Sequence, residues 1–194
     1  ETVAAFAASL ERLETEYVDL YLTHAPFAGP QRLNQWRALL ELKDGGRARA
    51  VGVSNFGVGH LEEIDAAGLP LPAVNQIEVH PYFCNEDARA ASIRHGVEVE
   101  AWSPIAQGAV LDDEVIGKIA AAHGKTPSQV TLRWHVERGD IVFPKSMKRE
   151  RMEENFAIFD FELSPEEIDA ISALDRGEDG RRGPNPDTFD YVPA

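Results

Sequence analysis

The chain contains almost no cysteine: Cys84 is the single one among 194 residues. One cysteine excludes an intramolecular disulfide framework and any metal site built on several cysteine thiolates. Glu78 and His80 stand two residues apart and would share one face of a strand, which is suggestive of a metal pair. Two ligands without a third are poor evidence for such a site, so no metal ion is predicted.

Long apolar runs are lacking as well. No stretch approaches the roughly 20 apolar residues that a membrane-spanning helix needs, and no secretory signal is recognisable. The sequence therefore predicts a cytoplasmic protein without a membrane partner.

Basic residues are scarce beside acidic ones. The chain has 19 Lys and Arg against 33 Asp and Glu, which gives a formal net charge of −14. Such a charge argues against nucleic acids and anionic membranes as partners. Two origins of the acidity stay open: an ordinary acidic cytosolic protein, which is the favoured interpretation, or adaptation to high salt.

The order of hydrophobic patterns indicates an α/β fold. Helical periodicities alternate with five short apolar runs that are typical of buried strands, at residues 18–22, 48–54, 74–79, 97–102 and 141–143. Thr126 and Ser164 each begin a capping box with proline at the first helical position. This alternation predicts parallel strands covered by helices.

Polar residues recur where these strands end, as at His24, Ser54 and Lys145. Clustering at the carboxyl ends of parallel strands is typical of a (β/α)₈ barrel. A doubly wound sheet is the alternative, but no Gly-x-Gly-x-x-Gly follows any strand. A partial barrel comprising five strands is therefore favoured, over residues 1–175. Residues 176–194, rich in glycine, proline and charge, are predicted to form a loop or tail over the barrel mouth.

The segment from Ile141 to Asn155 carries the clearest chemical signal. An apolar run ends in Pro144, Lys145 and Ser146, and Arg151 follows in a helical pattern. A cation and a hydroxyl next to a helix N-terminus, with a planar guanidinium in the following turns, favour a phosphate. The alternative from these residues alone is a strand-to-helix turn with solvated basic side chains.

At these residues the chain resembles the aldo-keto reductases, particularly the bacterial 2,5-diketogluconate-reductase-like branch. The resemblance covers nearly the whole chain and is carried by Tyr17–His24, Val51–Phe56, Val74–Tyr82, Ala101–Pro104 and Pro144–Ser146, with Arg151, Glu154 and Asn155. It implies a (β/α)₈ barrel in which NADPH delivers hydride to the carbonyl carbon of a small aldehyde or ketone. It also implies a structural role for Glu78 and His80.

The resemblance assigns roles residue by residue. His24 matches the active-site histidine, which orients and polarises the substrate carbonyl. The cofactor-binding matches are Ser54, Asn55 and Gln76 for the nicotinamide amide, Trp102 for stacking on the nicotinamide ring, Ser103, Ile105 and Gln107 for the pyrophosphate, Lys145, Ser146 and Arg151 for the adenosine 2′-phosphate, and Glu154 and Asn155 for the adenine.

The chain departs from the family pattern in two respects. The tyrosine that donates the proton in this family, with its lysine and aspartate, is expected on three strands that precede this sequence, so the chain alone is expected to be inactive. Ala25 stands where the family usually has tryptophan, which is expected to widen or reshape the substrate pocket.

Two functions stay open at this point: a reductase in its complete form, or a non-catalytic NADPH-binding or interaction subunit. A complete barrel is expected to be a monomer, whereas open strand edges would favour self-association.

Overall fold

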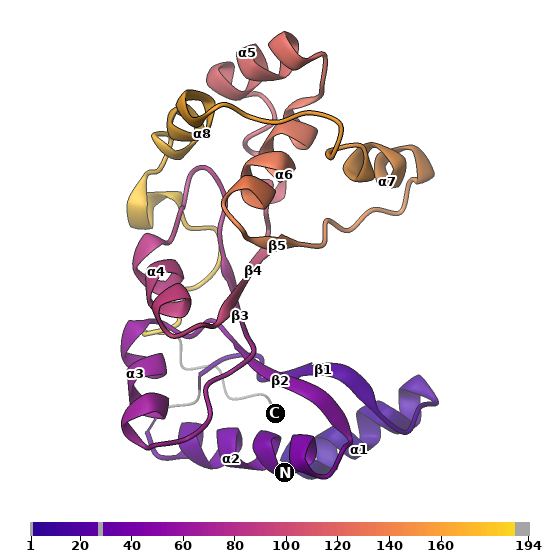
Figure 1. Ribbon diagram of the computed structural model, residues 1–194, viewed down its shortest axis with the longest axis vertical. Coiled ribbons are helices and arrows are strands. Elements are labelled where there is room, and N and C mark those ends of the chain that lie inside the picture. Colours follow the sequence, from indigo (N-terminus) through magenta and orange to yellow (C-terminus); the bar gives the residue numbers. More distant parts are fainter. Residues whose placement is uncertain (1, 27–28, 189–194) are drawn as a thin grey trace. The chain divides into compact units, whose positions relative to one another are not determined.

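The computed structural model describes residues 2–26 and 29–188 (Figure 1). Contacts divide the chain into two compact units. The first comprises Glu1–Gln76, Asp87–Glu98 and Asn185–Ala194, and the second comprises Ile77–Glu86 and Val99–Pro184. The predicted boundary between residues 175 and 176 stays a prediction, and the last six residues of the predicted tail lie outside the described part.

Strands and helices alternate, as the hydrophobic pattern predicts. The elements are α1 (Thr2–Leu13), β1 (Val18–Leu22), α2 (Gln31–Asp44), β2 (Ala48–Ser54), α3 (Val58–Ala66), β3 (Val74–Glu78), α4 (Glu86–Arg94), β4 (Glu98–Trp102), a 3₁₀ turn at Ala106–Gly108, α5 (Glu114–His123), α6 (Pro127–Glu137), β5 (Ile141–Val142), α7 (Arg149–Phe156), α8 (Pro165–Ser172) and a 3₁₀ turn at Gly177–Gly180. The strands are ordered β1-β2-β3-β4-β5, and the pairs β1–β2, β2–β3 and β4–β5 are parallel. This is the α/β fold of a partial (β/α) barrel.

All five predicted strands are present, and the differences lie at their ends. The third ends at Glu78 rather than Val79, the fourth begins at Glu98 rather than Val97, and the fifth ends before Phe143. Phe143 precedes Pro144, which has no N–H to offer a neighbouring strand, so pairing stops there.

The first unit is built around a hydrophobic core between β1, β2 and helices α1 to α3. Phe6, Trp36, Val53 and Leu61 are fully or almost fully buried in it, and the Trp36 indole N–H donates to the Pro70 carbonyl at 2.9 Å. Gly52 lies where β2 is most crowded. A Cβ there would come within 2.7 Å of the Val74 carbonyl oxygen, so no larger residue fits without moving the strands.

The second unit owes its helix ends to capping side chains. Thr126 and Ser164 form the two predicted capping boxes with Gln129 and Glu167, and the Asp113 carboxylate accepts from the N–H groups of Val115 and Ile116. Pairing of these otherwise free N–H groups fixes where α5, α6 and α8 begin. Among the described residues, no helix is both long and apolar enough to span a membrane.

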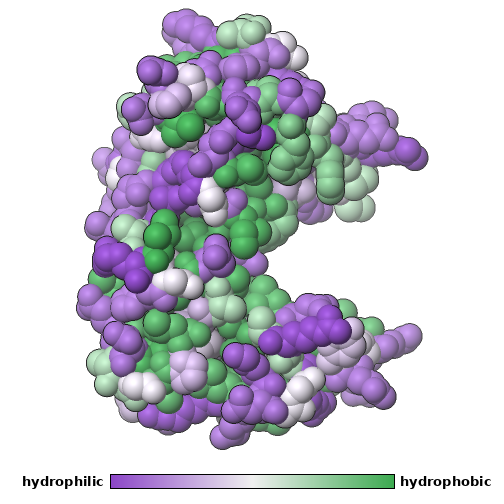
Figure 2. Space-filling view, viewed as in Figure 1, coloured by the Kyte–Doolittle hydropathy of each residue, from purple (hydrophilic) through white to green (hydrophobic). Residues whose placement is uncertain are grey.

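Helix α7 differs from the other helices of this unit because it has no buried residue. Its projecting end is hydrophilic, whereas hydrophobic residues gather on the surface over β5 and α6 (Figure 2). A cavity of about 660 Å³ in this unit is lined by side chains that include Leu132, Ile141 and Phe159.

Candidate functional site

In the first unit, the carboxyl ends of three strands bring four of the predicted site residues together. The Asn55 side-chain amide donates to the His24 carbonyl and to the Ser54 hydroxyl oxygen, at 3.1 Å each. The Ser54 hydroxyl donates to the Gln76 carbonyl at 2.8 Å, and the Asn55 backbone N–H donates to the same oxygen at 2.9 Å. The turn that follows β2 is thereby fixed to the ends of β1 and β3, and the His24 side chain is exposed.

Asn55 has a left-handed backbone with φ of 62°, a conformation that asparagine tolerates better than most residues. Beneath it, the fully buried Asn75 side chain donates to the Phe56 carbonyl at 2.8 Å and accepts from the Phe56 N–H at 3.3 Å. Its amide also donates to the Ser92 hydroxyl on α4 at 3.1 Å. Sequence reasoning missed Asn75 as a support of this turn, although a lone amide in an otherwise apolar strand is a usable signal.

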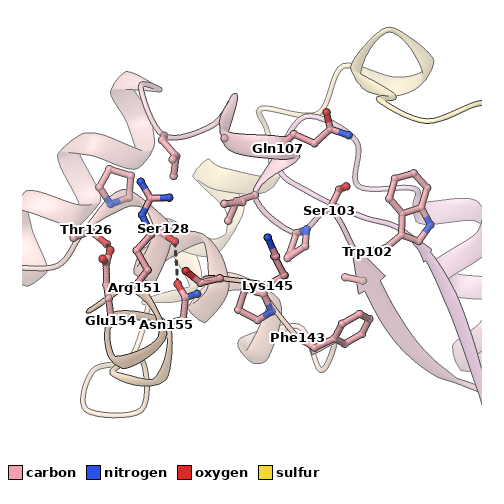
Figure 3. Close-up of a pocket in the computed structure, with 18 residues that line it drawn as sticks. Trp102, Ser103, Gln107, Thr126, Ser128, Phe143, Lys145, Arg151, Glu154 and Asn155 are labelled. Carbon is pink, nitrogen blue, oxygen red and sulfur yellow. Dashed lines mark hydrogen bonds between the residues drawn. The ribbon is translucent and has the colours of Figure 1, made fainter. Parts of the chain in front are cut away.

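In the second unit, the remaining predicted site residues line one cavity of about 870 Å³. The nine are Trp102, Ser103, Ile105, Gln107, Lys145, Ser146, Arg151, Glu154 and Asn155. Figure 3 shows Trp102 at one end and Arg151, Glu154 and Asn155 at the other, with Lys145 between them. The cavity therefore presents an aromatic ring at one end and cations in its middle and at its far end.

The loop after β4 is held in an unusual backbone conformation. Ser103, Ala106 and Gln107 have φ values of 52°, 48° and 56°, and none of them is glycine. Such residues cost free energy, and they cluster at binding and active sites. Successive backbone N–H groups in turns of this kind form small concavities that bind anions.

The N-terminus of α6, which the sequence indicates only as a capping box, also lines this cavity, at the end that holds Arg151 (Figure 3). Pro127 and Ser128 line the cavity, and the Ser128 hydroxyl bonds to the Asn155 side chain at 3.5 Å. The Thr126 hydroxyl bonds to the Glu154 carboxylate. No spacing rule links Thr126 to α7, so only the fold brings these residues to the site.

His135 supports the loop from behind. Its side chain is fully buried. Its Nε2 donates to the Pro104 carbonyl at 3.0 Å, and its Nδ1 lies 3.1 Å from the Asp140 carboxylate. The histidine therefore joins α6 to the strained loop, which a helical pattern in the sequence does not reveal.

Three comparisons identify the family. The model of the aldo/keto reductase family matches residues 1–176. The chain belongs to this family. Glyoxal reductase of Bacillus subtilis is 48% identical over 186 residues, which cover 96% of this chain and 66% of the relative. An aldo-keto reductase of Mycolicibacterium smegmatis is 47% identical over 193 residues, covering 98% of this chain and 69% of the relative.

Solved structures agree with the family assignment. A crystal structure of a Gox0644 mutant in complex with NADPH superposes with a TM-score of 0.93 at 44% identity, over 98% of this chain and 70% of that one. The aldo/keto reductase chain described here thus spans about two thirds of the length of its relatives. Among residues 2–26 and 29–188, no group of three side chains is arranged to hold a metal ion.

Proposed function

We propose that the complete protein reduces small aldehydes and ketones with NADPH. The observation that carries this proposal is the cavity of the second unit, which is lined by an aromatic ring, a strained loop and two cations. Two comparisons support it: one relative is named a glyoxal reductase, and one solved neighbour is a complex with NADPH.

NADPH fits the chemistry of this cavity. Trp102 offers a flat face for the nicotinamide ring, and the loop carrying Ser103, Ile105 and Gln107 offers backbone N–H groups to the pyrophosphate. Lys145, Ser146 and Arg151 would hold the adenosine 2′-phosphate, with Glu154 and Asn155 beside the adenine. A guanidinium matches a phosphate with two parallel hydrogen bonds, which favours NADPH over NADH.

When bound, NADPH supplies the hydride. The chain's own residues would orient both reactants: Ser54, Asn55 and Gln76 would bind the nicotinamide amide, and an imidazole N–H of His24 would donate to the carbonyl oxygen of the substrate. A donor directed at the oxygen where negative charge develops lowers the barrier more than it strengthens substrate binding. Ala25, next to His24, would leave room for the substrate.

No residue of this chain matches the family's tyrosine, lysine and aspartate. We therefore expect the 194-residue chain to oxidise no NADPH with glyoxal or methylglyoxal, and NADPH oxidation by the purified chain would contradict this expectation.

The cofactor assignment is tested by replacing Arg151 with alanine and titrating with NADPH and NADH. Arg151 is exposed, so solvent screening places its contribution at the low end for a charge-assisted hydrogen bond, about 1.5 kcal/mol or roughly tenfold in Kd. The loss is expected for NADPH and not for NADH.

Arg149→Ala is the matched control, because Arg149 also lies on α7 but pairs with Glu153 and does not line the cavity. An equal loss for both cofactors, or the same loss in the control variant, would contradict the assignment of the 2′-phosphate site.

A further inference from the structure

A buried carboxylate, that of Glu78, is not explained by the proposed cofactor contacts. The Glu78 side chain is completely buried at the end of β3. Its Oε1 accepts from the Arg182 N–H at 2.6 Å and from Nε2 of His80 at 3.0 Å, and its Oε2 accepts from the Gly183 N–H at 2.9 Å. Three donors on one buried carboxylate give it a fixed position.

The hydrogen bond to Glu78 determines which ring nitrogen of His80 carries a proton. A carboxylate accepts but does not donate, so Nε2 must carry the proton. Among the described residues Nδ1 has no hydrogen-bond partner, and the ring is fully buried. The histidine thus gives the carboxylate a hydrogen-bond donor in addition to the two from the C-terminal segment.

Gly183 connects the carboxylate to Trp102. A Cβ on Gly183 would lie 2.4 Å from Cη2 of the Trp102 ring and 3.2 Å from Oε2 of Glu78. Separations this short leave no space for a side chain, so the glycine backbone itself packs against the edge of the indole. The Trp102 ring and the Glu78 carboxylate therefore both contact Gly183.

The segment leading to Gly183 is fixed by contacts to Tyr82. The Arg176 N–H donates to the Tyr82 carbonyl at 3.0 Å, and the Arg176 guanidinium lies 3.6 Å from the centre of the Tyr82 ring. Gly180 passes so close that a Cβ would come within 1.7 Å of the same carbonyl oxygen. These contacts fix the backbone of residues 176–180, which leads to Gly183 beside Trp102.

We propose that Glu78 and Gly183 are positioning residues for Trp102: the buried carboxylate fixes the backbone at 182–183, and this backbone sets the plane of the indole. The consequence for the cofactor rests on the function proposed above, since it requires Trp102 to contact the nicotinamide. The C-terminal segment then acts on the reacting end of NADPH and leaves the phosphate end unaffected.

The test uses Glu78→Gln and Gly183→Ala, with Gly117→Ala as the matched control because nothing lies within 4 Å of a Cβ at that position in α5. The first readout is the quenching of tryptophan fluorescence by acrylamide, which needs no cofactor. Trp36 and Trp134 are 1% and 0% exposed, so the half-buried Trp102 dominates this quenching. Each variant is also measured with Trp102→Phe added, and the difference isolates the Trp102 near-ultraviolet circular dichroism.

The second readout compares NADPH with adenosine 2′,5′-bisphosphate, which carries the 2′-phosphate but no nicotinamide. We expect a changed Trp102 signal in both variants and not in the control. We expect NADPH to bind about fivefold more weakly or worse, the scale of one lost stacking contact, with unchanged binding of the bisphosphate.

The outcomes separate the two proposals. An unchanged Trp102 signal in Gly183→Ala overturns the positioning role, whether or not Glu78→Gln folds. Equal weakening of both ligands overturns it too, because that result indicates a general structural defect. A changed Trp102 signal with unaltered NADPH binding overturns the link to the cofactor and, with it, the stacking proposed for Trp102.

Discussion

Replacing Asn75 with alanine should strongly destabilise the first unit. The Asn75 amide is the partner of both the N–H and the carbonyl of Phe56, and all of these atoms are buried. Each buried polar group left without a partner costs about 1–3 kcal/mol, so the two Phe56 groups predict a loss of about 2–6 kcal/mol in the free energy of unfolding. Urea denaturation of the wild type and the variant measures this loss.

Ser92→Ala provides the control for this prediction. The Ser92 hydroxyl accepts one hydrogen bond from Asn75 and donates one to the Ala88 carbonyl at 2.9 Å, so its removal leaves no backbone group of Phe56 unpaired. This removal leaves one N–H of the buried Asn75 amide without a partner, so we expect a loss of about 1–3 kcal/mol, roughly half that of Asn75→Ala. Hydrogen exchange at the Phe56 amide should accelerate in Asn75→Ala only. Equal losses in the two variants, with equal exchange rates, would refute the reasoning.

Two further predictions concern titrating groups of the second unit. Burial raises the pKa of the Cys84 thiol from 9.0 to about 11. Because the thiolate is the reactive form, the folded chain should react with Ellman's reagent at pH 8 about a hundredfold more slowly than the urea-unfolded chain. Similar rates would contradict the burial of Cys84. Burial raises the pKa of Glu78, but hydrogen bonds from His80, Gly183 and Arg182 outweigh it, and the pKa lies below its ordinary 4.5. The stability that Glu78 contributes is therefore complete above pH 4.5 and is lost as the pH falls further. The difference in unfolding free energy between wild type and Glu78→Gln should shrink below pH 4.5, and a constant difference down to pH 3 would argue against this role.

The sequence predicts the strands and capped helices well because local rules govern them. Apolar runs such as Val18–Leu22 and capping boxes such as that at Thr126 depend on residues only a few positions apart. The burial of His135 was not predictable, because its partners are the Pro104 carbonyl and Asp140, which only the tertiary fold places around its ring.

The same limit applies to the candidate site. The residues assigned by resemblance in the second unit line one cavity, since a family motif already encodes a shared three-dimensional arrangement. The contributions of Asn75 and Gly183 were missed, since each depends on distant contacts: Asn75 with Phe56 and Ser92, and Gly183 with Glu78, which lies 105 positions away in sequence. Hydrophobic periodicity carries no information about pairs this far apart.

The difference in sequence separation has a consequence for the order of assembly. All residues that line the cavity of about 870 Å³ lie between Ala101 and Asn155, so its contacts join residues that are closer in sequence than Glu78 and Gly183 are. The entropy lost on closing a loop grows with its length, so contacts between residues close in sequence lose less entropy and can form earlier. Synthesis on the ribosome adds to this order, because every cavity residue emerges before Gly183 does. A nascent chain can thus complete the part of the cavity lined by Lys145 and Arg151 before Gly183, the residue proposed to position the Trp102 ring, has been synthesised.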